Sequence, residues 1–250
     1  EVENTCPDCK YPWMASLQRV THGGGDAGDH FCGGVLVDEN WVLTAAHCVD
    51  GPYGSGIAVT DYINTLQVEL GVHNQSGTEG SEFYSVLNII LHPLMSGFPN
   101  YDFALLRLDG PVSERFTPIQ PITNSDYDND GTIGTVIGWG SDTEGNQPGT
   151  DELREVDLMV YDDCGGYSGT GPSHLCAGVL PDAEASELAG HCTGDSGGPF
   201  IINLGTEEYP LYELIGIVSG HWGACGDPEA MSLYAKVDEL VNPSNVEGAD

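Results

Sequence analysis

Three short segments of the sequence carry residue types that together can perform nucleophilic catalysis. His47 lies in the segment TAAHCVD, Asp102 begins the apolar segment DFALLRL, and Ser196 lies in the segment CTGDSGGPF. A serine hydroxyl is a weak nucleophile, which needs a base to accept its proton, a carboxylate to orient that base, and donors for the developing oxyanion. The order histidine, aspartate, serine therefore predicts acyl transfer at Ser196.

The segment around Ser196 also fits the G-x-S-x-G turn of α/β-hydrolases, in which an acid and then a histidine follow the nucleophile. Between Ser196 and His221 the sequence has no aspartate, only three glutamates, and it lacks the alternating helices of such a fold. This alternative is therefore disfavoured. Taken alone, His47 would more often be structural and Asp102 a turn residue, so the prediction of catalysis depends on their combination with the serine.

Short apolar runs between turn residues predict that β-strands position these groups. The 250 residues include 35 glycines and 15 prolines, which favours short strands over long helices. Residues 155–160 alternate in polarity as a strand does. The other expected strands are 34–37, 41–43, 66–70, 86–91, 103–108, 132–139, 200–204, 211–219 and 233–237. Only residues 234–241 have a helical period. The proline-containing segment 109–124 separates two halves, so two β units with a site between them are expected.

The sequence is extremely acidic, with 39 acidic against 6 basic residues and a formal net charge of −33. This charge excludes a non-specific nucleic-acid binder, which needs a basic surface, and it opposes binding to anionic membranes. A solvated surface selected for solubility accounts for it. The second interpretation is a life in high salt or with divalent cations, because self-repulsion weakens an unscreened fold.

The even number of cysteines predicts a disulfide framework and an oxidising compartment. They are Cys6, Cys9, Cys32, Cys48, Cys164, Cys176, Cys192 and Cys225. Only Cys6 and Cys9 have the close spacing of a metal or redox pair, and a small local disulfide is favoured over zinc, which needs two further ligands. No signal segment opens the chain, and we expect an already processed protein that is secreted and extracellular.

The segments LTAAHC, DFALLRL, CTGDSGGP and IGIVSG resemble the chymotrypsin-like (trypsin-fold) serine peptidases, and the resemblance covers residues 12–237. It implies an all-β fold of two six-stranded antiparallel β-barrels with a short C-terminal helix. It also implies a single peptidase domain over residues 1–250, with the N-terminal barrel at 12–112 and the C-terminal barrel at 123–237. The implied activity is that of a secreted serine endopeptidase, and the alternative is a catalytically silent or zymogen-state binding protein on the same fold.

The resemblance also assigns roles to single residues. Ser196 would attack the peptide carbonyl to form an acyl-enzyme, His47 would act as base and then acid, and Asp102 would orient the histidine. The N–H groups of Gly194 and Ser196 would form the oxyanion hole, and Ser219 matches the serine that hydrogen-bonds the triad aspartate. No cofactor is needed for this chemistry.

The resemblance implies three disulfides and a set of partners. The implied pairs are Cys32–Cys48, Cys164–Cys176 and Cys192–Cys225, and Cys6 is then paired with Cys9, because residues 153–156 lack the cysteine that an N-terminal cysteine reaches in many family members. The expected partners are protein or peptide substrates and protein inhibitors. We expect a monomer that binds neither nucleic acid nor membranes.

The predicted specificity pocket departs from that of trypsin. The substrate-binding residues implied by the resemblance are Gly190, His191, Ser219, Gly220, His221, Trp222 and Ser232. Gly190 stands where trypsins carry the aspartate that selects lysine or arginine. For the residue on the amino side of the scissile bond (P1), we therefore expect aromatic or large apolar side chains first. Acidic or hydrogen-bonding side chains come second, because two histidines lie near the pocket, and basic ones third, through Glu184 or Glu187.

The N-terminus also departs from the family pattern. In family members the freed N-terminal amine pairs with the acid before the nucleophile, which is Asp195 here, whereas this chain begins with Glu1 and Val2. A carboxylate near Asp195 is unfavourable. Three explanations remain open: one residue is missing before Glu1, the chain is an unactivated form, or another cation serves Asp195.

Two acidic segments are candidates for structural calcium. GVHNQSGTEGSE resembles the calcium loop of the trypsin family, with Glu79 and Glu82 in place and Val72 instead of the first carboxylate. A second segment has the D-x-D-x-D-G spacing of a calcium loop but lacks the closing glutamate of an EF-hand, and its carboxylates are Asp126, Asp128 and Asp130. Acidic surface turns are the alternative for both segments.

Overall fold

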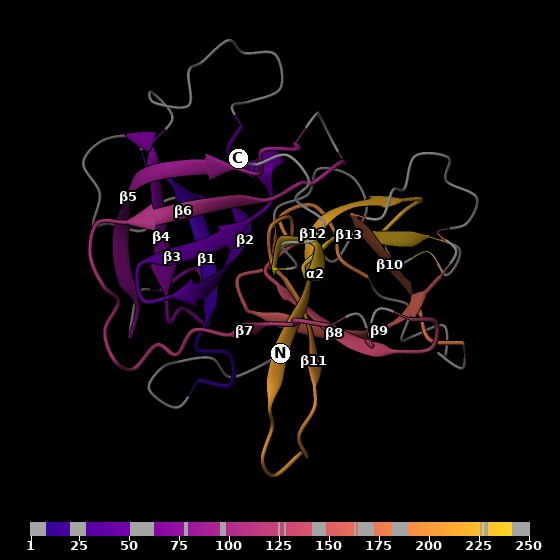
Figure 1. Ribbon diagram of the computed structural model, residues 1–250. Helices are drawn as coiled ribbons and strands as arrows, with labels where there is room; N and C mark the ends of the chain where they lie inside the picture. Colours follow the sequence, from indigo (N-terminus) through magenta and orange to yellow (C-terminus); the bar gives the residue numbers. More distant parts are fainter. Residues whose placement is uncertain are drawn as a thin grey trace.

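The computed structural model describes residues 9–20, 29–50, 63–77, 80–95, 99–124, 126–127, 129–141, 149–162, 164, 173–181, 190–225, 227 and 230–241. Two antiparallel β-barrels stand beside each other, the first in indigo to magenta and the second in pink to yellow (Figure 1). The all-β prediction is confirmed. Three of the predicted site residues, Cys6, Glu79 and Asp128, lie outside the described residues, as do Glu1, Val2, Glu184 and Glu187.

The first barrel is closed by six strands in the order β1-β2-β3-β6-β5-β4. The strands are β1 (Met14–Arg19), β2 (Asp29–Asp38), β3 (Trp41–Thr44), β4 (Leu66–Leu70), β5 (Glu82–Leu91) and β6 (Ala104–Leu108). Strand β1 was not predicted from the sequence. It buries the polar residues Ser16 and Gln18 together with its apolar neighbours, so it shows no alternation of polarity. The amide of Gln18 is satisfied inside the barrel by Gln67 and Glu69.

The second barrel is closed by six strands in the order β11-β8-β9-β10-β13-β12, with β11 paired to β12. The strands are β8 (Ile133–Gly138), β9 (Arg154–Tyr161), β10 (His174–Gly178), β11 (Pro199–Asn203), β12 (Tyr212–Trp222) and β13 (Met231–Lys236). In its core the rings of Phe200 and Tyr234 stack with centroids 4.3 Å apart. The short strand β7 (Gln120–Pro121) comes from the segment between the barrels and pairs with β12 in parallel.

Two short helical elements lie entirely among the described residues, the 3₁₀ turn η1 (Ala46–Cys48) and the C-terminal helix α2 (Asp238–Val241). The helical period over residues 234–241 therefore overestimates the helix. Tyr234 belongs to β13, where its side chain is fully buried, and the helix begins only at Asp238. Within the described part of the chain, no helix is both long enough and apolar enough to cross a membrane.

Disulfides fix the loops that surround the space between the barrels. The structure contains the bonds Cys32–Cys48, Cys164–Cys176 and Cys192–Cys225, which are the pairs that the family resemblance implies. The first bond joins β2 to η1, and the third joins the segment before Ser196 to the segment after β12. Cys9 is also disulfide-bonded.

Hydrogen bonds between main-chain and side-chain groups hold the two barrels together. The N–H of Gly33 in β2 donates to the carbonyl of Ser196 over 2.7 Å. The ring of His174, at the start of β10, donates through Nε2 to the carbonyl of Pro99 over 2.8 Å, and Trp139 donates through Nε1 to the carbonyl of His73 over 3.1 Å. The position of one barrel relative to the other is therefore set by directional contacts on both sides of the site.

Candidate active site

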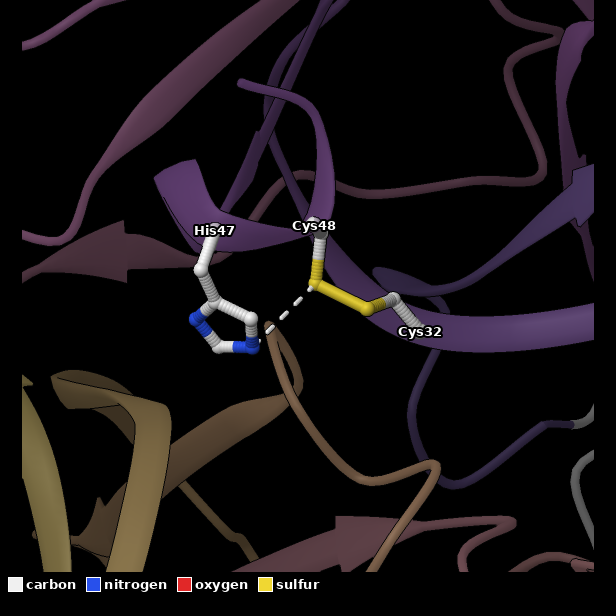
Figure 2. A group of neighbouring side chains, drawn as sticks. All are labelled: Cys32, His47 and Cys48. Carbon is white, nitrogen blue, oxygen red and sulfur yellow. Dashed lines mark hydrogen bonds between the residues drawn. A yellow bond between two sulfur atoms is a disulfide. The ribbon is translucent and has the colours of Figure 1, made fainter. Parts of the chain in front are cut away.

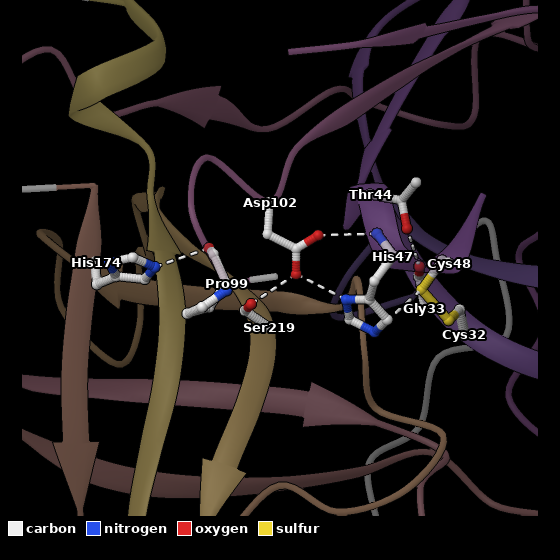
Figure 3. Close-up of polar contacts among 9 residues, drawn as sticks. All are labelled: Cys32, Gly33, Thr44, His47, Cys48, Pro99, Asp102, His174 and Ser219. Atoms are coloured by element: carbon white, nitrogen blue, oxygen red, sulfur yellow. Dashed lines mark hydrogen bonds and ion pairs between the residues drawn. A yellow bond between two sulfur atoms is a disulfide. The ribbon is translucent and has the colours of Figure 1, made fainter. Parts of the chain in front are cut away.

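His47 and Asp102 form a hydrogen-bonded pair on the first barrel. His47 lies in η1, directly after β3 and beside the Cys32–Cys48 bond, and Asp102 lies two residues before β6. The ring Nδ1 of His47 is 2.7 Å from Oδ2 of Asp102, and the backbone N–H of His47 donates to Oδ1 over 2.8 Å (Figure 3). Because a carboxylate can only accept, Nδ1 carries the proton. Nε2 is left with a lone pair and can act as a base.

The second barrel supplies a further donor to the same carboxylate. Ser219 in β12 donates through Oγ to Oδ2 of Asp102 over 2.6 Å, so that Asp102 lies between Ser219 and His47 (Figure 3). Asp102 is fully buried, and a buried carboxylate is tolerated only when its lone pairs are satisfied. Three hydrogen bonds provide that satisfaction here.

The residue before Asp102 has an unusual backbone conformation. Tyr101 has φ of 48°, in the left-handed region that non-glycine residues rarely adopt. Its ring is stacked on the ring of His92, with centroids 4.8 Å apart and planes within 4° of parallel. Such strain persists where the surroundings over-determine it, and it is enriched at functional sites. Here it turns the chain into β6 just where Asp102 must point toward His47. Nothing in the sequence signals this conformation.

Ser196 lies on a glycine-rich turn that the first barrel holds from its backbone. Its carbonyl accepts the N–H of Gly33, and the carbonyl of Gly33 in turn accepts the hydroxyl of Thr44 over 2.8 Å, three residues before His47. Gly197 has φ of +79°, and a Cβ on it would lie 2.2 Å from Oγ1 of Thr44 and 2.5 Å from the carbonyl oxygen of Gly33. Only glycine allows this approach, which brings the half-buried Ser196 against the segment that carries His47.

The N–H groups of Gly194 and Ser196 are available to a ligand. Gly194 has φ of +103°, which again favours glycine. Among the residues that the structure describes, neither of these two N–H groups has a hydrogen-bond acceptor. The neighbouring N–H groups of Asp195 and Gly197 do have acceptors, the carbonyls of Cys192 and Val218. Two unpaired donors on one turn are what a developing oxyanion requires.

His30 supports this turn from the first barrel, which the sequence did not reveal. Its Nε2 donates to the carbonyl of Gly194 over 3.1 Å, so its Nδ1 is the acceptor from the hydroxyl of Ser16 at 2.8 Å. Burial lowers the pKa of His30 to about 4, although the Gly194 carbonyl favours the protonated ring. A neutral His30 thus links the strand pair β1–β2 to the turn that contains Gly194 and Ser196. The only sequence signal was a histidine at the start of an apolar run.

Asp195 is a buried carboxylate next to Ser196. Its Oδ1 accepts the N–H of Gly140 over 2.7 Å, and its Oδ2 accepts the N–H of Cys192 over 2.9 Å. Burial raises its pKa to about 6, and these two hydrogen bonds only partly oppose the shift. The described residues contain no cation paired with it. The N-terminal residues that the sequence analysis considered in relation to it lie outside them.

Part of the predicted specificity pocket lines a small cavity. The lining includes four residues that the sequence analysis named: Gly190, His191, His221 and Ser232. Ser219, Gly220 and Trp222 lie on β12, which also carries His221. Asp227 lines the cavity as well, and it was not foreseen.

Three side chains lie as close together as the ligands of a metal site, but they lack the chemistry to bind a metal. Ligand atoms of Cys32, His47 and Cys48 all lie within 4.8 Å of one another (Figure 2). The two sulfurs are joined in a disulfide, and a thiolate, not a disulfide sulfur, is the ligand that metals bind. Nε2 of His47 is 3.9 Å from the sulfur of Cys48. This cluster therefore serves to fix the histidine.

Among the described residues, the acidic side chains of these two segments do not gather into a group that could hold a metal ion. Val72 is buried, and Glu82 forms an ion pair of 2.8 Å with Arg115. Burial alone would raise the pKa of Glu82, but the hydroxyl of Tyr84 and the charge of Arg115 outweigh it and lower the pKa. The first loop therefore fits a calcium ion poorly.

In the second segment, the N–H groups of Asp126 and Asp130 donate to the side chains of Asn124 and Asp162.

Comparisons with known proteins agree with this geometry. The sequence model of the family described as Trypsin matches residues 3–243. The chain is 36% identical to Trypsin-1 of Salmo salar over 219 residues, which covers 85% of this chain and 78% of that protein. It is 34% identical to Serine protease 1 of Rattus norvegicus over 245 residues, covering 95% of this chain and 85% of that protein. Trypsin of Squalus acanthias is 31% identical over 245 residues, with 95% and 90% covered.

Proposed function

The chain belongs to the trypsin family of serine endopeptidases, and we propose that Ser196, His47 and Asp102 are the catalytic triad with which it hydrolyses peptide bonds. The observation that carries this proposal is the buried carboxylate of Asp102, which is bonded to His47 at 2.7 Å and to Ser219 of the other barrel at 2.6 Å. A buried carboxylate that accepts hydrogen bonds from both barrels is well placed to orient the ring of His47 as a base.

The order of proton transfers follows from the hydrogen bonds. Nδ1 of His47 holds a proton against Asp102, so Nε2 can take the proton of the Ser196 hydroxyl as its oxygen attacks the peptide carbonyl. The imidazolium that forms is stabilised by the adjacent carboxylate. It then donates the proton to the leaving amine, and an acyl-enzyme on Ser196 remains. Water attacks the acyl-enzyme by the same route, with His47 again acting as base.

The N–H groups of Gly194 and Ser196 are the proposed oxyanion hole. The left-handed conformation of Gly194 and the hydrogen bond from His30 to its carbonyl support this assignment. Removing one donor of such a site typically slows the chemical step by about 10²- to 10³-fold. Because these donors belong to the backbone, side-chain substitution cannot remove them, and they are lost only if the turn changes shape.

The proposal also covers the substrates, the location and oligomeric state, and the bound partners of the protein. The protein acts on protein or peptide substrates and needs no cofactor for the reaction. We propose that it is a secreted monomer, which the disulfide framework supports. Protein inhibitors would bind across the same cavity. Bound calcium is not required by any step, and the ion pair between Glu82 and Arg115 argues against it at the first loop.

The proposal is tested by covalent labelling of Ser196 with an organophosphorus reagent that carries no peptide. Native protein should be labelled stoichiometrically at Ser196 and should cleave an unfolded protein. The variants Ser196→Ala and His47→Ala should lose both properties. Ser85→Ala is the matched control, because Ser85 lies exposed on β5. Folded protein that is neither labelled nor active would instead support the silent binding protein on the same fold.

A further inference from the structure

The cavity beside Ser196 has an unusual polar lining, and its chemistry bears on which substrates the protein takes. This inference rests on the proposed function, because the cavity becomes a substrate pocket only if Ser196 is the nucleophile. Two imidazole rings, those of His191 and His221, line it with centroids 5.8 Å apart and nearly perpendicular planes. Neither ring takes part in the proposed proton transfers.

His191 presents a buried ring nitrogen without a hydrogen-bond partner. Its side chain is 3% exposed, and its Nδ1 lies 3.3 Å from the hydroxyl of Tyr234. Among the described residues, Nε2 has no hydrogen-bond partner. When the ring is protonated, both of its nitrogens are donors.

A buried polar nitrogen without a partner is costly, and a ligand oxygen would satisfy it once the nitrogen carries a proton. Burial, with the nearby charge of His221 as a smaller contribution, lowers the pKa of His191 to about 3, while the Gly220 carbonyl favours the protonated ring. The ring is therefore neutral in the free protein. A carboxylate placed against Nε2 would form a charge-assisted hydrogen bond and would favour the imidazolium.

His221 completes the polar lining from β12. Its Nδ1 donates to the carbonyl of Gly223 over 3.0 Å. The ring is exposed, so it can rearrange around a bound side chain at little cost. Together the two histidines place one buried, fixed ring and one exposed, adaptable ring on the same cavity.

The lining also disfavours the other classes of P1 side chain. An aromatic or large apolar side chain would cover Nε2 of His191 and leave it unpaired, a loss that strongly disfavours such ligands in polar sites. A lysine or arginine would need a carboxylate. Asp227 is the one acidic residue among the described lining residues. The titratable groups that act on His191 are His221 and His47, and Asp227 lines the same cavity.

We propose that this cavity selects an acidic P1 side chain, with the Nε2–H of His191 as the donor to its carboxylate and His221 as the second contact. His191 is then the main specificity-determining residue, and Asp227 opposes it. Our ranking of P1 classes from the sequence alone, which put apolar side chains first, is replaced by this one. The reason is the unpaired buried nitrogen, which no sequence pattern reveals.

The test uses five peptide substrates that differ only at P1, which is Glu, Gln, Leu, Phe or Arg. The wild-type protein should have its highest kcat/KM on the Glu peptide. In His191→Ser the ratio of kcat/KM for Glu over Leu should fall by about 10- to 100-fold. A ratio within one variant is insensitive to the fraction of folded protein. His221→Gly should lower the ratio less, and Asp227→Asn should raise it by a few fold.

His73→Ser is the matched control, because His73 also has a buried ring nitrogen without a partner among the described residues but lies near β4, away from the cavity. The ratio should not change in this variant. A wild-type preference for Leu, Phe or Arg would overturn the inference, as would equal cleavage after Glu and Gln or an unchanged ratio in His191→Ser. In each of these cases the proposed function stands. Failure of the organophosphorus reagent to label wild-type protein would instead refute both.

Discussion

The two barrels contribute to the site in different ways. In the proposed site, the first barrel provides the imidazole of His47 and the carboxylate of Asp102, which are bonded at 2.7 Å. The second barrel provides the hydroxyls of Ser196 and Ser219 and, in addition, backbone, because the turn around Ser196 depends on glycines at positive φ and offers main-chain N–H groups. Each side chain can be deleted by exchanging one residue. The backbone groups are lost only if the course of the chain changes.

This difference predicts two kinds of damage. A substitution on the first-barrel side should abolish turnover while the fold stays intact, because the lost group is an acceptor or a base. A substitution in the glycine turn should lower stability and turnover together, because Gly197, which packs against Thr44 and Gly33, directly follows Ser196, one of the two proposed oxyanion donors. Four experiments test this difference between the barrels.

The largest effect is expected for Asp102→Asn. An amide in place of the carboxylate presents an N–H₂ group to one of its three donors, which favours the wrong tautomer of His47 and leaves Nε2 unable to accept a proton. We expect kcat/KM to fall by about 10⁴-fold with little change in melting temperature. The same exchange at the exposed Asp109, Asp109→Asn, should have no effect. A large loss of stability in Asp102→Asn would contradict the separation between the barrels.

Gly197→Ala should destabilise the protein by about 3 to 5 kcal/mol and also reduce labelling of Ser196. The left-handed backbone costs an alanine about 1 to 2 kcal/mol, and the new Cβ, 2.2 Å from Oγ1 of Thr44, adds overpacking. Gly110→Ala is the control, because a Cβ there meets nothing within 4 Å. Denaturant unfolding of both variants measures the difference. Equal stability would mean that the turn tolerates a side chain.

Asp195→Asn tests the buried charge in the second barrel through the pH dependence of stability. Its pKa in the folded protein is about 6, above the ordinary 3.8, so the native state binds more protons than the unfolded state between these values. Stability from this group is therefore full below about pH 4 and declines as the pH rises to about 6, by about 3 kcal/mol. Asp195→Asn should lack this decline.

The measurement is the free energy of unfolding of both proteins between pH 4 and 7, and only the pH-dependent part of their difference is compared. The amide also disturbs the hydrogen bonds to Gly140 and Cys192, but that cost does not vary with pH. The many surface acids titrate equally in both proteins. Parallel curves would show that Asp195 has a cation partner in solution.

The smallest effect is expected at the ion pair between Lys10 and Glu155, which joins the segment before β1 to β9. Nζ of Lys10 is 2.9 Å from the carboxylate, and the two side chains are 41% and 31% exposed. We expect Lys10→Met to change stability by less than about 1 kcal/mol and the change to shrink in high salt. A larger value would mean that the barrels are held together by surface charge rather than by the contacts around the site.

Much of the fold and the chemistry could be predicted from the sequence. Most strands follow from apolar runs, and the segments around His47, Asp102 and Ser196 indicate the family by themselves. Strands β1 and β10 could not be predicted, because they bury polar residues, Gln18 and His174, whose partners come from distant elements. Apolar periodicity carries no information about a polar side chain that is satisfied inside a barrel.

Several details of the site geometry could not be predicted from the sequence either. The positive φ of Tyr101 and the link from His30 to Gly194 depend on tertiary contacts. The burial of His191 and its contact with the hydroxyl of Tyr234 arise only in the folded barrel. Residue types indicate which chemistry is available, whereas burial and hydrogen bonding in the folded protein determine which atoms carry protons.

The hydrogen bond from the N–H of Gly33 to the carbonyl of Ser196 has a consequence for how activity responds to stress. This bond, with the contact of Ser219 to Asp102, means that the working site exists only while the two barrels are docked. A slight separation of the barrels would switch the enzyme off while each hydrophobic core remained whole. Catalytic turnover is therefore a more sensitive gauge of inter-barrel docking than any spectroscopic signal of secondary structure.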